Sequence, residues 1–205
     1  MNLRTSLLAL SLLLSGLAFA QQPLKELSSE EYKVLAAALE GFRAAGMAHH
    51  PMIAAFTSTS QCTPGCNGFE MNGCNGLRSK NETMGERLAV VKRDLPKLEQ
   101  ATISDFITKS KECSTVEKNI PTESPYFLSH PESNEKLPSG WEHPDFVFVS
   151  RVGLNGEGTQ ALVNISFASG TNAGDSGGKY FLFVKNNKNK WEAMGSSAVW
   201  KLLSL

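Results

Sequence analysis

The chain has 205 residues, with 20 Lys or Arg side chains balanced by 20 Asp or Glu side chains, so its formal net charge is zero. This balance argues against a protein that binds nucleic acid or anionic lipid by charge alone. The hydrophobic fraction of 41% is enough to build one sizeable core, which favours an ordinary globular domain.

Residues 1–20 have the pattern of a cleaved signal peptide. Arg4 supplies the positive start, residues 7–14 are apolar except for Ser11, and an A-x-A cleavage site ends at Ala20. The apolar run is too short to span a membrane, and no Cys follows the site as a lipoprotein requires. We therefore expect a secreted or periplasmic protein without a membrane span, folded as a single domain over residues 21–205.

The clearest predicted helix follows Ser28, which forms a capping box with Glu31 three residues later. We interpret the neighbouring pair Glu30 and Glu31 as part of this cap rather than as a catalytic acid pair. The helix is expected to end near Gly46. Its apolar side chains recur on one face, at Tyr32, Leu35, Ala36, Leu39 and Phe42.

Residues 57–83 form a long loop rich in Gly, Asn, Ser and Thr, and this loop contains three of the four cysteines. In an exported chain an even number of cysteines predicts disulfides, here two bridges with three open connectivities. A zinc site is the weaker alternative, because the spacings C-x3-C and C-x7-C differ from the usual C-x2-C pairs. We expect no metal and no cofactor. The cysteines concerned are Cys62, Cys66, Cys74 and Cys113.

Two further helices are predicted before the chain becomes irregular. One has apolar residues from Met84 to Leu95 and stops at Pro96, and the next is expected to be capped by Thr102 with Asp105 at its third position. Residues 119–144 then hold five of the nine prolines, so we expect an irregular segment lying across the domain rather than a strand of a sheet.

From residue 145 onward the hydrophobic period changes to two, which predicts four strands joined by short turns. Phe146, Phe148 and Val152 are expected to share one face of the first strand. The predicted fold is therefore α+β: N-terminal helices packed on a four-stranded antiparallel β-meander, with a cystatin-like arrangement by architecture only.

The turn between the second and third predicted strands contains Gly-Asp-Ser-Gly-Gly, the pentapeptide that carries the nucleophile in trypsin-like serine proteases. In that chemistry Ser176 would attack the carbonyl, and the backbone N–H groups of Gly174 and Ser176 would form the oxyanion hole. The order His, Asp, Ser is available in the chain. The histidine would be His49 or His50, and the aspartate Asp94 or Asp105.

The surroundings of the pentapeptide favour a turn over a nucleophile. The histidines lie in "MAHHPM" rather than an A-A-H-C context, Lys179 stands where these proteases have Pro, and no pair of six-stranded barrels is predicted. Gly, Asp and Ser are also the ordinary residues of a connection between strands. The sequence assigns no catalytic residue unless the protein is a hydrolase.

The C-terminal block resembles a set of exported bacterial proteins of unknown function, over about a third of the mature chain. Their pattern is S-R-V-G-F-N, Q-A-L-V, a Gly-rich turn, Y-x-L-x-K, G-K-W-x-V and a late Trp. In this chain Leu154 replaces the Phe of the pattern and Asn189 replaces its Gly. The matching positions are Arg151, Gly153, Asn155, Gln160-Ala161-Leu162-Val163, Tyr180, Lys185, Trp191 and Trp200.

This resemblance implies an exported protein but no activity, because none is known for the family. The sequence therefore predicts a non-enzymatic protein that binds an unknown protein or small-molecule ligand, through a concave sheet face or the Cys-rich loop. The alternative is a serine hydrolase that uses Ser176.

Overall fold

The computed structural model describes residues 25–44, 51–54, 57, 84–112, 114–116, 120–122, 126–129, 136–137, 139–140, 145–168 and 176–202. Its helices are α1 (Ser29–Ala44), α3 (Met84–Asp94) and α4 (Gln100–Lys109). Its strands are β1 (Lys25–Glu26), β2 (Pro51–Ala54), β3 (Ser114–Thr115), β4 (Phe127–Ser129), β5 (Asp145–Val149), β6 (Gly153–Leu154), β7 (Gln160–Ala168), β8 (Ser176–Lys185) and β9 (Trp191–Leu202).

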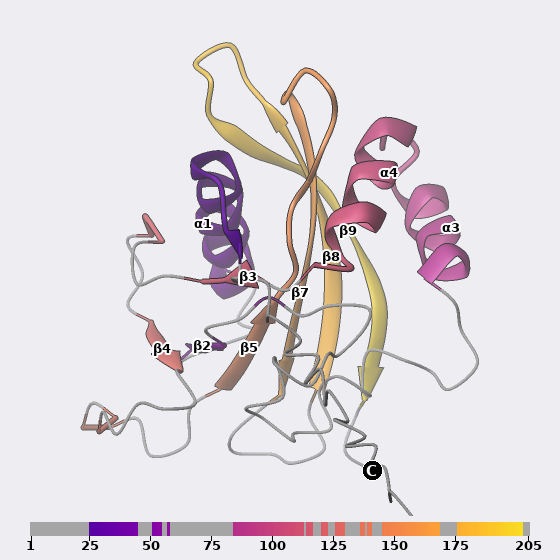
Figure 1. Cartoon of the computed structure of the whole chain (residues 1–205). Coiled ribbons are helices and arrows are strands. Elements are labelled where there is room, and N and C mark those ends of the chain that lie inside the picture. The colour runs from indigo at the N-terminus through magenta and orange to yellow at the C-terminus, as the bar shows by residue number, and fades with distance from the viewer. Residues whose placement is uncertain are drawn as a thin grey trace, which may run out of the picture.

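The main sheet is mixed and has seven strands in the order β4-β2-β5-β7-β8-β9, with β6 paired to β7 (Figure 1). Its C-terminal part, β5-β7-β8-β9, is antiparallel with neighbours in chain order, as predicted. The prediction of a four-stranded antiparallel meander is wrong because β2 joins the sheet parallel to both β4 and β5. The fold is α+β, and the finer likeness to cystatins has no support here.

Two of the strands that the sequence missed, β2 and β4, are short and lie beside prolines. Pro51 opens β2, a position where a missing N–H is tolerated, and β4 is a three-residue strand inside the Pro-rich segment 119–144. A run of three or four residues is too short to reveal a period, so pairing with β5 decides its conformation.

Helix α1 packs against one face of the sheet. Its predicted apolar stripe is confirmed, since Leu35, Leu39 and Phe42 are buried. The ring of Phe42 meets Phe167 of β7 edge-on, with 5.6 Å between centroids. The sheet contributes alternate residues of its central strands to this cluster, namely Val147, Val149, Ala161, Val163, Ile165, Phe181 and Phe183.

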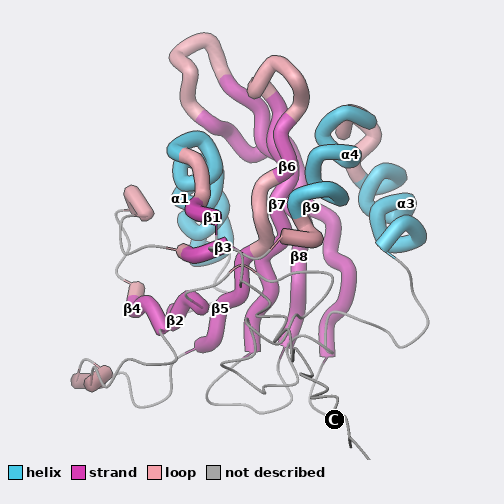
Figure 2. Tube along the Cα trace, in the orientation of Figure 1, coloured by secondary structure: helices cyan, strands magenta, loops and turns pink. Residues whose placement is uncertain are grey.

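Helices α3 and α4 cover the opposite face of the sheet. Leu162, Tyr180 and Leu182, which alternate along β7 and β8 with the residues that face α1, pack with Leu88, Val91 and Phe106. Figure 2 shows the helices on either side of the strands. The sheet is therefore sandwiched between helices over β7 and β8.

Two local predictions need correction. Thr102 does not cap α4, because the helix begins at Gln100 after Glu99 and the Thr102 side chain is buried within it. Val147 and Val149, rather than Phe146 and Phe148, face α1 from β5 together with Val152. Both phenylalanines are only half-buried.

The turn between β8 and β9 explains one departure from the resembled pattern. Asn189 has a φ of 58°, a left-handed conformation that Gly adopts freely and that Asn tolerates better than most residues. Asn189 stands where the pattern has Gly. The Asn186 carboxamide oxygen accepts hydrogen bonds from the N–H groups of Lys188 and Lys190 and closes the turn.

Candidate functional site

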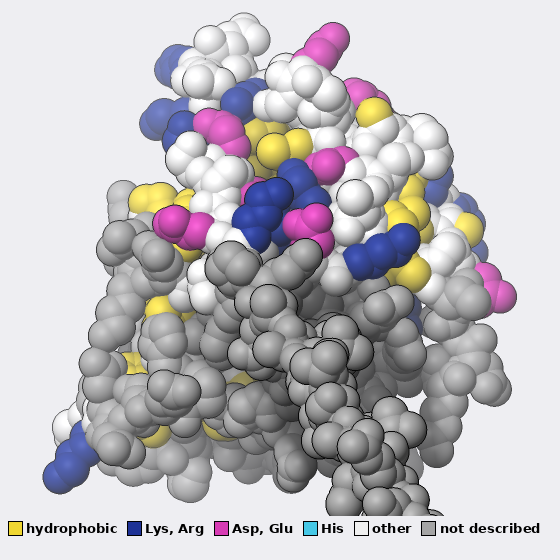
Figure 3. Space-filling model, viewed as in Figure 1, with side chains coloured by type: hydrophobic (Ala, Val, Ile, Leu, Met, Phe, Trp, Pro, Cys, Tyr) yellow, Lys and Arg dark blue, Asp and Glu magenta, His cyan; other side chains and the backbone are white. Residues whose placement is uncertain are grey.

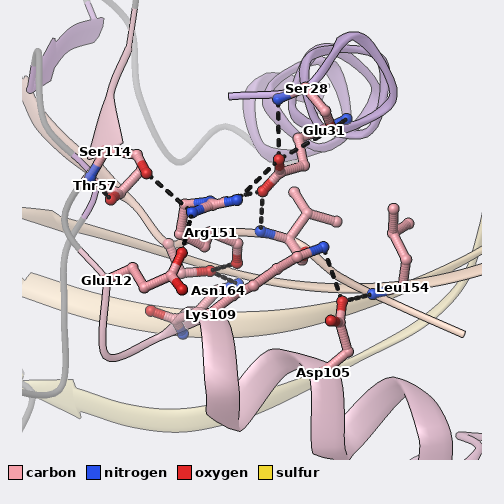
Figure 4. Close-up of polar contacts among 12 residues, drawn as sticks. Ser28, Glu31, Thr57, Asp105, Lys109, Glu112, Ser114, Arg151, Leu154 and Asn164 are labelled. Atoms are coloured by element: carbon pink, nitrogen blue, oxygen red, sulfur yellow. Dashed lines mark hydrogen bonds and ion pairs between the residues drawn. The ribbon is translucent and has the colours of Figure 1, made fainter. Parts of the chain in front are cut away.

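Arg151 is the largest of the fully buried side chains in the described residues, with a relative exposure of 2%. It follows β5 and precedes β6, and its guanidinium reaches α1 (Figure 4). Nε donates to Glu31 Oε1 at 2.7 Å and Nη2 donates to Glu31 Oε2 at 3.1 Å, which makes a two-pronged ion pair. Nη1 donates to Glu112 Oε2 at 3.0 Å and to Ser114 Oγ at 2.9 Å.

Glu31 has two structural roles. Its Oε2 accepts hydrogen bonds from the N–H and the hydroxyl of Ser28, both at 2.9 Å, so the predicted capping box is confirmed. The same carboxylate binds Arg151. Burial alone raises the pKa of Glu31, but the hydrogen bonds from Arg151 and Ser28 and the charge of Arg151 outweigh it, so the pKa lies below its ordinary value.

The rim of this cluster ties two separate chain segments together. Ser114, which accepts from Arg151, also makes two hydrogen bonds with Thr57: the Thr57 N–H donates to the Ser114 carbonyl, and the Ser114 N–H donates to the Thr57 hydroxyl oxygen Oγ1. Glu112 completes the rim, and its side chain is 45% exposed. The cluster thus joins α1, the segment after α4, Thr57 and the β5–β6 connection.

A second group of polar contacts lies beside the first. Asp105 of α4 accepts a hydrogen bond from the N–H of Leu154 at 2.7 Å and pairs with Lys109 at 2.8 Å. Lys109 also donates to the carbonyl of Val152. These contacts hold α4 against β6 on the side of the sheet away from α1 (Figure 4).

Gln160 of β7 attaches the start of α4 to the sheet through hydrogen bonds. Its Oε1 accepts from the N–H of Glu99 at 2.6 Å and from the hydroxyl of Thr102 at 3.0 Å, and its Nε2 donates to the carbonyl of Lys97. The N-terminal N–H groups of a helix lack partners within the helix, so Gln160 replaces the missing cap from another strand.

The chemistry open to the Arg151–Glu31 cluster is limited. An arginine has five N–H donors, and four of those of Arg151 are bonded to Glu31, Glu112 and Ser114. Arginine does not release its proton in proteins, and the lowered pKa of Glu31 keeps that carboxylate ionised at neutral pH. The cluster therefore acts as an internal brace rather than as a general acid or base.

Ser176 lies at the first residue of β8, opposite Ala168 of β7 and Leu202 of β9. Gly177 and Gly178 are buried residues of the same strand, so the second half of the pentapeptide belongs to the sheet. Gly174 and Asp175 lie outside the described residues. The predicted connection between strands is thus shorter at its C-terminal end than expected, because pairing with β7 and β9 extends to Ser176.

The two aspartates considered as partners of Ser176 are engaged elsewhere. The Asp105 carboxylate binds Leu154 N–H, and Leu154 is aligned through Ala161 with Phe183 of β8. Phe183 lies about 23 Å along the strand from Ser176, at roughly 3.3 Å per residue.

Asp94 is nearer to Ser176 but also out of reach. Its Oδ2 accepts a hydrogen bond from the Ser197 hydroxyl at 2.7 Å, and Ser197 pairs with Tyr180 of β8. Tyr180 lies about 13 Å along β8 from Ser176. The hydrogen bond from Ser197, followed by that from Arg93, lowers the pKa of Asp94.

The remaining predicted residues lie outside the described part of the chain. These are the candidate bases His49 and His50 and the cysteines Cys62, Cys66, Cys74 and Cys113. Among the residues that are described, no group of three or more His, Cys, Asp or Glu is arranged to hold a metal ion. No described helix is long and apolar enough to cross a membrane.

The sequence matches no protein-family model, and comparisons with curated proteins and with solved structures also find no match. Sequence reasoning missed the pairing of Glu31 with Arg151, although one signal was present. Glu31 lies on the stripe formed by Leu35 and Phe42, at helical spacing. A carboxylate on a buried stripe needs a buried cation, and Arg151 is an arginine next to a buried strand.

Proposed function

We propose that this chain is an exported, non-enzymatic protein that binds a protein partner or a small ligand through the Cys/Gly-rich loop 57–83. The signal-peptide pattern of residues 1–20 and the four cysteines support export to an oxidising compartment. The resemblance of the C-terminal block to exported bacterial proteins points the same way.

The proposal that the protein is not an enzyme is supported by one observation: the hydrogen-bonding capacity of the buried Arg151–Glu31 cluster is almost fully used within the chain. Glu31 accepts from Arg151, from Ser28 and, at 3.4 Å, from the N–H of Val152. A catalytic carboxylate or guanidinium needs bonding capacity left for a substrate, and this pair spends nearly all of it on its own chain. The buried polar residues of this cluster therefore have a structural role: they link α1 to the connection between β5 and β6.

The loop is favoured over a sheet face as the binding surface. Helix α1 packs on one face of β7 and β8, and α3 and α4 pack on the other. A long loop pinned by disulfides presents a preorganised surface, and loops on a rigid scaffold commonly carry binding residues. Figure 3 shows basic and acidic side chains interspersed over the described part of the viewed face.

The test is a pull-down from the native envelope or culture fluid with two variants beside the wild type. One replaces residues 67–73, between Cys66 and Cys74, by a Gly/Ser linker of equal length. The matched control replaces Lys188 and Lys190 of the exposed β8–β9 turn by Ala. A partner retained by the control and lost by the loop variant, at unchanged melting temperature, supports the proposal. Equal capture by both variants overturns the assignment to the loop.

The disulfide and hydrolase hypotheses have separate tests. A thiol titration of the exported protein should find no reactive cysteine, and four reactive thiols would refute the bridges. The pentapeptide alone supports the alternative that Ser176 is a nucleophile. A fluorophosphonate probe that labels the wild type but not Ser176→Ala would establish a hydrolase, whereas unlabelled wild type would end that alternative.

A further inference from the structure

Met194 is the most exposed large hydrophobic residue in the described part of the chain, at 45% against 37% for Leu137. It lies in β9, which forms one edge of the described sheet (Figure 2). The register of β9 with β8 shifts between Ala193 and Gly195, so Met194 is the extra residue of a β-bulge. Its neighbours Glu192 and Ala193 are exposed as well. The Met194 side chain is therefore accessible to small molecules in solution.

The other two methionines that the structure describes are protected. Met52 is 8% exposed and lies in β2, between two other strands of the sheet. Met84 begins α3 and is partly buried, and its Sδ accepts a hydrogen bond from the hydroxyl of Tyr180 at 3.9 Å. Oxidation of a methionine requires an oxidant to reach the sulfur, so accessibility separates Met194 from Met52 and Met84.

We propose that Met194 is a methionine-oxidation site, at which a peroxide converts the thioether to the sulfoxide without unfolding the domain. In this step the sulfur lone pair forms the new S–O bond while the O–O bond of the peroxide breaks. The sulfur is oxidised by two electrons and the peroxide is reduced, so hydrogen peroxide leaves as water after a proton transfer. Sulfoxide reductases convert the product back to methionine, which makes the modification reversible.

The position of the sulfoxide decides its effect on the fold, because a sulfoxide is more polar than a thioether. At Met52 the new oxygen would be a polar group inside the sheet, which lowers stability. At Met194 the oxygen is accessible to water, and the bulge leaves this residue without a cross-strand partner in the register with β8. Oxidation at Met194 should therefore lower the melting temperature by less than about 2 °C.

Limited oxidation of the purified protein with hydrogen peroxide, followed by mass analysis of its peptides, tests the proposal. Met194 should gain oxygen at least about fivefold faster than Met52, in line with exposed fractions of 45% and 8%. The same reaction in concentrated urea should remove this difference, because unfolding exposes both side chains. Met84→Leu is a matched control that should leave the rate at Met194 unchanged. A sulfoxide reductase added to the folded, oxidised protein should restore Met194.

The effect on the fold is measured by comparing the wild type with Met194→Leu after the same treatment. Faster oxidation at Met194 together with equal melting temperatures of the two treated proteins supports the proposal. Equal oxidation rates at Met194 and Met52 in the folded protein overturn it. So does a peroxide treatment that destabilises the wild type but not Met194→Leu, since oxidation at Met194 would then disturb the domain. The pull-down result for loop 57–83 is independent of all these outcomes.

Discussion

The two faces of the sheet are held to their helices in different ways. The face toward α1 is almost wholly apolar along β7, with Ala161, Val163 and Ile165, and it ends at a fully buried ion pair. On the face toward α3 and α4, β7 contributes Leu162 and then two polar residues, Asn164 and Ser166. On this face the apolar cluster is smaller. It is supplemented by the hydrogen bonds of the uncharged Gln160 side chain and by the partly exposed ion pair between Asp105 and Lys109.

This difference indicates where the fold is vulnerable. Apolar packing is not directional, so the stripe holds α1 on the sheet without determining its exact rotation or axial position. We expect the directional Arg151–Glu31 ion pair to determine both. The shorter helices bury less apolar surface, so α4 depends on hydrogen bonds at its start and on close backbone contact with β6. Substitutions that remove contacts of α1 should therefore lower the free energy of global unfolding. Substitutions that remove contacts of α4 should in addition increase the local opening of that helix, which hydrogen exchange detects.

The largest effect is expected for Arg151→Met, which leaves the carboxylate of Glu31 buried without its cation. The free energy of unfolding should fall by about 3–5 kcal/mol, measured by urea denaturation. Adding Glu31→Gln should recover much of the loss, because Gln removes the charge and still accepts from Ser28.

The control for Arg151→Met is Arg93→Met, since the Arg93 side chain is 74% exposed. That substitution should change the unfolding free energy by less than about 0.5 kcal/mol. Equal effects of the two substitutions would show that the buried pair is not what holds α1 in place.

The second prediction probes the contact between β6 and α4. A Cβ at Gly153 would lie 2.5 Å from Phe106 Cβ and 2.7 Å from the Phe106 backbone, so Gly153→Ala must push the helix off the strand. We expect a loss of about 2–3 kcal/mol in thermal or urea unfolding. Gly156→Ala is the matched control, because nothing lies within 4 Å of its added Cβ. A neutral Gly153→Ala would mean that α4 is loosely seated.

A smaller loss, about 1–3 kcal/mol, is expected for Gln160→Met, which leaves the N–H of Glu99 and the carbonyl of Lys97 without their partner. Hydrogen exchange should accelerate in the first turn of α4 more than in α1. Gln100→Met, at an exposed position of the same helix, should leave both quantities unchanged. Uniform acceleration in both helices would contradict the separation of the two faces.

The smallest stability effect concerns Glu30 at the start of α1. Hydrogen bonds from Lys33 and Lys185 lower the pKa of Glu30 from 4.5 to about 2, and Trp191 Nε1–H also donates to it. Because the folded pKa is the lower one, this contribution to stability is present above pH 4.5 and is lost as the pH falls toward 2.

Lys185→Gln should therefore raise the pKa of Glu30 toward 4.5 and reduce stability at neutral pH by less than about 1 kcal/mol. An NMR titration of the Glu30 carboxyl, with exposed Lys190→Gln as control, measures the shift. An unchanged pKa in Lys185→Gln would assign the whole effect to Lys33.

Local patterns predicted the elements that are long enough to show a period. The stripe from Leu35 to Phe42, the helix before Pro96 and the alternation in β7 and β8 are all confirmed. The capping box of Ser28 and Glu31 is confirmed as well. Ser176 was expected in a turn, whereas pairing with β7 and β9 makes it the first residue of β8.

What the sequence determined by itself was therefore the content and order of most helices and strands, because burial of one face imposes its period on any stretch of ten or so residues. Only the tertiary structure decided that β2 and β4 join the sheet in parallel, that Gln160 replaces Thr102 as the support of α4, and that Arg151 meets Glu31. These contacts join residues far apart in the chain. A buried charge or an unpaired helix end requires a partner, but its own sequence neighbourhood does not specify which one.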